Sequence, residues 1–266
     1  MSLINTNQDY LATMGIAEES PQVGLIVSVY YLGCAVGAVL FSWLADRYGR
    51  KIGLFTCLAT ATLGNLIMFV SGLGYSRGAL VVMYAGRVVM GLGVGGVDSV
   101  VPTYSSELSP DHGRGKAMAQ EFQSNIFGLV MAFAVNLGVT RALGKYNQWA
   151  WRIPIIVMQI YSASLLFVIR RLPESPRWFV FHEENEKAKS SLKKMYGDEE
   201  GEKKAEEFIE AAKKEADDNV SYADMLIPGR SQFHPTAITI MGQVNQALTG
   251  YGGKCQLLNL IRVPFD

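Results

Sequence analysis

Five long stretches of this sequence carry almost no charge, and each is long enough to cross a lipid bilayer. Val23–Ala45 and Ile52–Ser76 contain no charged residue at all. A helix that crosses about 30 Å of hydrocarbon needs roughly 20 mainly apolar residues. Lipid offers no partner to backbone N–H and C=O groups, so uncharged stretches of this length are expected to be helical. We therefore predict an all-α, polytopic membrane helix bundle.

The distribution of basic residues predicts how these helices are oriented. The expected spans, with a shorter sixth candidate, are Gln22–Ala45, Ile52–Ser76, Gly78–Ser106, Ala117–Thr140, Trp151–Ile169 and Pro235–Gly253. Basic residues cluster after the first, third and fifth spans, at Arg47, Arg50, Lys51, Arg114, Lys116, Arg170 and Arg171. Since cytoplasmic loops are enriched in Lys and Arg, these turns are predicted to be cytoplasmic. Tyr146, Trp149 and Trp151 are expected to form an aromatic belt at the outer interface.

This topology divides the chain into five parts. They are an extracellular segment (1–21), five transmembrane helices (22–171), a cytoplasmic helical linker (172–234), a further partial transmembrane helix (235–253) and a divergent tail (254–266). The linker is rich in Lys and Glu. It fits two interpretations, a solvated charged connection or a cytoplasmic clamp that bridges membrane helices.

Composition excludes several classes of function. The formal net charge is +0, so no long-range field favours binding to nucleic acid. The three Cys and three His residues are scattered, which argues against a disulfide framework or a metal site. We see no Ser-His-Asp, metal-ligand or nucleotide-binding arrangement, so we expect neither an enzyme nor a cofactor.

Two ionisable residues interrupt the apolar span Gly78–Ser106. Arg87 and Asp98 are eleven residues apart, close to three helical turns, so they share a face but lie roughly 16 Å apart along the axis. Each is either buried against a neighbouring helix or part of a polar cavity along that face. Four glycines between them, at Gly91, Gly93, Gly95 and Gly96, are expected to allow close helix packing.

Four short motifs occur in order along the chain. They are Asp46-Arg47-Tyr48-Gly49-Arg50-Lys51, Gly86-Arg87, the series Pro102, Tyr104, Glu107, Pro110, Arg114 and Gly115, and Pro173-Glu174-Ser175-Pro176-Arg177-Trp178. Together they resemble the sugar-porter family of the major facilitator superfamily. Trp151-Arg152-Ile153-Pro154-Ile155 further resembles its fungal branch.

The resemblance implies a twelve-helix fold of two six-helix halves that rock about a central site, giving alternating access. It implies that cytoplasmic gate charges of the first half are Asp46, Arg47, Arg50, Glu107, Arg114, Glu174 and Arg177. Arginine can bind carboxylates bidentately and exchange them for water when a seam opens. The alternative is that these residues only fix the membrane topology. It explains Arg47, Arg50 and Lys51 but not the acidic residues among them.

The same resemblance implies where a solute would bind. Gln243 and Gln246 match the sugar site of the family's seventh helix. Phe122 stands where the family has a sugar-binding Gln, with Asn125 nearby, and Asp98 occupies a cavity position that most relatives leave uncharged. The implied substrate is a sugar or polyol. Whether a proton is a co-substrate is left open. The resemblance also implies a multi-pass protein of the plasma membrane.

Compared with this family, only five spans precede Pro173, and the likeness stops after Gly253. We therefore expect a fragment, truncated at both ends, that lacks the first helix and does not transport by itself. Two alternatives to a transporter remain, a non-transporting sugar sensor and a regulatory fragment that associates with a full-length porter.

The predicted orientation can be tested at Asn219-Val220-Ser221, a glycosylation sequon in the cytoplasmic linker. Because this side does not meet the glycosylation machinery, we expect Asn219→Gln to leave electrophoretic mobility unchanged in a eukaryotic host. A glycan-dependent mobility shift that this substitution abolishes would invert the topology.

Overall fold

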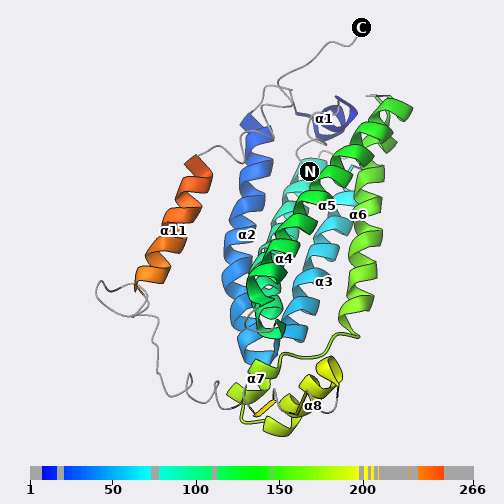
Figure 1. Ribbon diagram of the computed structural model, residues 1–266. Coiled ribbons are helices and arrows are strands. Elements are labelled where there is room, and N and C mark those ends of the chain that lie inside the picture. Colours follow the sequence, from blue (N-terminus) through cyan, green and yellow to red (C-terminus); the bar gives the residue numbers. More distant parts are fainter. Residues whose placement is uncertain are drawn as a thin grey trace. The chain divides into compact units, whose positions relative to one another are not determined.

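The computed structural model describes residues 8–16, 21–72, 78–109, 113–144, 146–197, 201–202, 205–206, 209, 227 and 233–248. Within these ranges all regular structure is helical (Figure 1). The helices are α1 (Gln8–Met14), α2 (Pro21–Tyr48), α3 (Arg50–Val70), α4 (Ala79–Leu108), α5 (Arg114–Leu143), α6 (Gln148–Ile169), α7 (Pro176–Phe181), α8 (Asn185–Tyr196) and α11 (Phe233–Leu248).

Helices α2 to α6 are long and apolar enough to cross a membrane. They contain between 21 and 30 residues each, and they correspond to the five long spans expected from the sequence. The prediction of an all-α bundle of membrane-length helices is confirmed. In Figure 1 these helices run side by side, with α1 at one end and α7 and α8 at the other.

The chain separates into two compact units, one reaching Ala212 and one starting at Lys213. The second unit contains α11, a helix of 16 residues that coincides with most of the sixth candidate span. Gln243 is exposed on this helix. The side chain of Gln246 lies outside the described residues, as do 249–253 and the tail from 254 to 266.

Helix α4 forms the centre of the first unit, between α2 and α3. A Cβ built on Gly33 of α2 would lie 2.8 Å from the backbone oxygen of Val88 in α4. Side chains at Gly95 or Gly93 of α4 would collide with the backbone of Cys34 in α2 or Ala61 in α3. The close packing predicted for the glycine-rich stretch is confirmed, and it operates on two faces of α4.

Apolar side chains form a core at each end of these helices. Near α1, buried residues from α1, α2, α3, α4 and α6 meet, including Tyr10, Ile26, Met68, Met83 and Trp151. Near α7, the core contains Phe41, Leu54, Cys57, Val100 and Tyr104. Each core joins at least three helices, so both ends of the first unit have packing of their own.

The position of Trp151 corrects one prediction. Its side chain is fully buried and cannot belong to an interfacial belt. The ring of Tyr10 packs edge-on against it with centroids 5.5 Å apart, and the indole N–H donates to Asp9 Oδ2 at 3.2 Å. Helix α1 therefore covers a tryptophan that would otherwise face the interface. Tyr146 and Trp149 remain exposed.

We expect Gly95→Ala to destabilise the bundle, because the new methyl group meets the backbone of α2 and forces α2 and α4 apart. Overpacking of this kind costs typically about 1–3 kcal/mol. Gly128→Ala on α5 is the matched control, since a Cβ there meets nothing within 4 Å. Thermal unfolding in detergent measures both variants, and equal melting temperatures would contradict the packing role.

Candidate functional site

A cluster of charged side chains lies where α2 and α4 end and α3 begins, beside α7 and α8. We call this region the charged end. Arg50 on the first turn of α3 donates from Nη2 to Glu107 Oε1 at 2.9 Å and from Nε to Oε2 at 3.1 Å. Arg50 Nη1 also forms an ion pair with Asp46, one turn earlier at the end of α2. A single guanidinium thus joins the ends of three helices.

The three members of this cluster differ in burial. The side chains of Arg50 and Glu107 are 13% and 6% exposed, whereas that of Asp46 is 58% exposed. Fork-shaped contacts between Arg and a carboxylate are strong because both hydrogen bonds are charge-assisted. Removing one partner of such a shielded pair leaves an uncompensated charge, which is costly. The exposed Asp46 pair contributes less, since water screens it.

Glu174 completes the charged end from the segment between α6 and α7. Its carboxylate accepts the backbone N–H of Lys51 at 3.1 and 3.2 Å and that of Ser175 at 3.0 Å. The residue preceding α3 is Gly49, which provides no side-chain cap. Glu174 therefore caps α3 from 123 residues away and places a negative charge at the positive end of the helix dipole.

Gly49 is required for this arrangement for two reasons. Its φ of 107° lies in a region that side chains disfavour. A Cβ at this position would also lie 2.5 Å from Glu174 Oε2. The glycine of the loop motif thus makes room for the carboxylate of the later motif.

The sequence did not predict several hydrogen bonds that hold the charged end together. Tyr104 donates to the Pro173 carbonyl at 2.6 Å, and Trp178 donates to the Asp46 carbonyl at 2.9 Å. Both residues belong to the quoted motifs, which could have signalled their role. Ser191 and Tyr196 donate to the carbonyls of Glu174 and Leu108. No sequence signal points to these two.

Two other predicted gate residues, Arg47 and Arg177, contact aromatic rings, and the side chain of a third, Arg114, is outside the described residues. Arg47 is exposed, and its guanidinium lies over the rings of Trp43 and Tyr48 at 5.6 and 5.9 Å. Arg177 lies over the ring of Phe181. The backbone of Arg114 starts α5, and its side chain is outside the described residues.

Arg87 and Asp98 share a face of α4, yet their surroundings differ. Arg87 is 3% exposed and lies beneath α1. Burial raises the pKa of the Tyr10 hydroxyl on α1, and the charge of Arg87 and a hydrogen bond from it oppose this shift. Asp98 is exposed. Its carboxylate interacts electrostatically with groups on two neighbouring helices, among them Tyr30 of α2 and Glu121 of α5.

Helix α5 carries the two remaining predicted positions of the first unit. Phe122 is 71% exposed, and Asn125 is exposed as well. Glu121, one turn before Asn125, is an ionisable residue that the sequence analysis missed. Its Oε2 atom is buried and has no hydrogen-bond partner within the part of the chain that the structure describes. Arg87 and Asp98 were chosen because they are charged residues within an apolar span, and the same criterion would have found Glu121.

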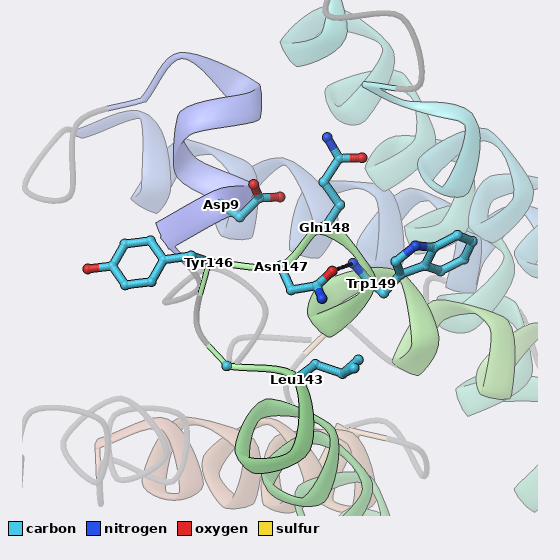
Figure 2. Close-up of a pocket in the computed structure, with 7 residues that line it drawn as sticks. Asp9, Leu143, Tyr146, Asn147, Gln148 and Trp149 are labelled. Atoms are coloured by element: carbon cyan, nitrogen blue, oxygen red, sulfur yellow. Dashed lines mark hydrogen bonds between the residues drawn. The ribbon is translucent and has the colours of Figure 1, made fainter.

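A hollow of about 660 Å³ lies near the opposite end, between α1 and the turn that joins α5 to α6 (Figure 2). Its lining residues are Asp9, Leu143, Gly144, Tyr146, Asn147, Gln148 and Trp149. Asn147 caps α6 by accepting the backbone N–H of Trp149, which Figure 2 marks with a dashed line. None of the predicted site residues lines this hollow.

Comparison with known proteins gives consistent matches along most of the chain. The family model described as sugar (and other) transporter matches residues 2–253. A low-affinity glucose transporter of Kluyveromyces lactis is 31% identical over 236 residues, which are 86% of this chain and 40% of the relative. The hexose transporter HXT11 of Saccharomyces cerevisiae is 32% identical over 173 residues, 65% of this chain and 29% of the relative.

Solved structures share the arrangement of helices. The proton:xylose symporter XylE bound to 6-bromo-6-deoxy-D-glucose aligns with a TM-score of 0.71 and 23% identity, over 82% of this chain and 49% of that one. A partially occluded, inward-open form of XylE from E. coli aligns with a TM-score of 0.72 and 23% identity, over 81% of this chain and 55% of that one. At this identity the likeness shows the fold. The chain spans less than half the length of these curated relatives.

We expect Glu107→Gln to destabilise the described bundle by about 3 kcal/mol, because it leaves Arg50 shielded from water without its main partner. In a double-mutant cycle, Arg50→Gln combined with Glu107→Gln should cost clearly less than the sum of the single changes. Unfolding of detergent-solubilised protein provides the measurement.

The exposed pair between Lys193 and Glu202, 3.3 Å apart, is the control for this cycle. Its coupling should be below about 1 kcal/mol, as for surface ion pairs in general. Equal coupling energies for the two pairs would show that the Arg50 cluster is merely a surface feature.

Proposed function

The chain belongs to the sugar (and other) transporter family, and we propose that it forms part of an alternating-access transporter for a sugar or polyol. Its membrane-length helices make it a multi-pass membrane protein. In this proposal, the described helices supply one cytoplasmic gate and one wall of the solute path. We place the transporter in the plasma membrane, where a cell exchanges carbohydrate with its surroundings.

The observation that carries the gate is the shielded contact between Arg50 and Glu107. Opening and closing requires contacts that hold one state firmly and are replaced by water in the other. Charged side chains meet this requirement, because their hydration offsets much of the pairing energy once a seam opens. Apolar contacts of the same area would have no such compensation from water.

The segment from Glu174 to Tyr196 supports the clamp interpretation of the linker. Trp178 of α7 and Tyr196 of α8 donate hydrogen bonds to carbonyls at the ends of α2 and α4. These contacts let a rearrangement of α7 and α8 act directly on the helix ends that carry Asp46 and Glu107. A solvated connector would not need hydrogen bonds at such positions.

The proposed wall of the solute path consists of Asp98, Glu121 and Asn125. All three lie within apolar spans, where polar groups are costly unless they face protein, water or a ligand. Carboxylates accept hydrogen bonds from hydroxyl groups, and an amide both donates and accepts, so the set suits a polyhydroxylated solute. Phe122 and Gln243 are proposed to contribute to binding, as is Gln246. The glucose transporter and the xylose symporter among the similar proteins favour a monosaccharide.

Asp98 and Glu121 also support a proton as co-substrate. A carboxylate within a membrane span can take up and release a proton, and such residues mark proton relays in many transporters. XylE is a proton:xylose symporter, which is consistent with this part of the proposal.

Solute binding to the purified 266-residue chain tests the proposal. We expect glucose, xylose or a six-carbon polyol to raise the melting temperature saturably in detergent, since a ligand that binds only the folded state stabilises it. Asp98→Asn and Asn125→Ala should weaken this binding about tenfold, or about 1.4 kcal/mol. Ser164→Ala on α6 is the control, because Ser164 is exposed and its hydroxyl donates to the Ile160 carbonyl of its own helix.

Two results would contradict the proposal. One is a melting temperature that none of the carbohydrates changes. The other is an effect of Ser164→Ala as large as those of the two variants in the proposed wall.

A further inference from the structure

Three basic side chains gather where α3 begins and α6 ends. Lys51 lies on the first turn of α3, and Arg170 and Arg171 directly follow α6. Lys51 Nζ donates to the backbone carbonyl of Arg170 at 2.8 Å, which joins the two helix ends. We call Lys51, Arg170 and Arg171 the basic corner.

Aromatic rings hold the two arginines of the basic corner in place. The guanidinium of Arg170 lies 5.3 Å from the ring centre of Phe55 in α3. That of Arg171 lies 4.6 Å from the ring centre of Phe167 in α6. A cation is attracted to the face of an aromatic ring even at exposed sites. Both arginines nevertheless remain exposed, so their N–H groups are available to a ligand.

Within the described residues, no ion pair joins these three cations to a carboxylate. The nearby carboxylate of Glu174 accepts the backbone N–H groups of Lys51 and Ser175. The described ion pairs use other cations, namely Arg50, Lys187 and Lys193. The basic corner therefore presents three positive charges that form no ion pair in this part of the chain.

The surface beside the basic corner is apolar. Ile52, Phe167 and Val168 are each about half exposed or more, within one turn of the helix ends. Because α3 and α6 are long and apolar enough to cross a membrane, we expect these side chains to face lipid and the basic corner to lie at the depth of the lipid headgroups. A phospholipid at this place would have its acyl chains against the apolar residues and its phosphate near the cations.

We propose that the basic corner binds the headgroup of an anionic phospholipid. Two guanidinium groups can donate paired hydrogen bonds to phosphate oxygens, and the lysine adds a third donor. The predicted orientation is consistent with this ligand, since anionic lipids are concentrated in the cytoplasmic leaflet. A bound lipid would connect the ends of α3 and α6 beside the Glu174 cap.

Titration of the detergent-purified chain with fluorescent phosphatidylglycerol, and with fluorescent phosphatidylcholine for comparison, tests this site. We expect tighter binding of phosphatidylglycerol. Each basic residue near an anionic lipid surface is worth about 1 kcal/mol, or about fivefold in affinity. Lys51→Gln combined with Arg170→Gln and Arg171→Gln should therefore remove most of the preference. Arg170→Lys with Arg171→Lys should retain much of it, because the charges stay.

A triple variant with the same loss of charge, Lys187→Gln, Lys189→Gln and Lys193→Gln on α8, is the control and should keep the preference. Glycerol 3-phosphate should compete poorly, because it lacks the acyl chains. Equal binding of the two lipids by the unaltered chain would overturn the proposal and leave the basic corner as a determinant of topology alone. An equal loss in the α8 variant, or full competition by glycerol 3-phosphate, would also overturn it.

Discussion

Backbone contact between α4 and its two neighbours is the constraint on which the rest of the first unit depends. Lipid tails are as apolar as the side chains they surround, so moving an apolar side chain from lipid to a helix interface gains little free energy. Close packing must therefore supply much of the attraction between helices. Gly33 in α2 and Gly93 and Gly95 in α4 allow backbones to touch where any side chain would separate them. The helix axes are thereby fixed relative to one another, and with them the positions of the side chains at their ends.

This fixed geometry explains how a few charges can link three helices at the charged end. Arg50 reaches Glu107 and Asp46 because three helices end at the same level. Glu174 adds a contact of another kind, since it binds backbone N–H groups at the start of α3 and not a cation. Opening of this end would expose an ion pair and a helix terminus together. Water can solvate both, so the contacts of the proposed gate could break and form again.

The sequence predicts the membrane-length helices and the glycine packing, because both depend on local composition and spacing. Through its motif the sequence also predicts a gate role for Glu174, but the atoms that its carboxylate binds depend on which loop lies over α3. The prediction for Trp151 was wrong, because α1 arises in a segment that hydropathy leaves unassigned and then covers that indole. Glu121 was overlooked, although an acid in an apolar span is visible in the sequence. Local sequence patterns do not show which residues from distant parts of the chain will pack against each other.

The different surroundings of Arg87 and Asp98 show how an element outside the membrane spans decides the role of residues within them. Helical periodicity places both on one face of α4 and makes them equivalent. Tyr10 of α1 then covers Arg87, so this cation belongs to the packing at the end of the bundle. Asp98 lies beyond the reach of the seven-residue α1 and stays exposed toward α2 and α5. A short helix at one end of the bundle thus separates a charge that is packed against α1 from one that stays exposed.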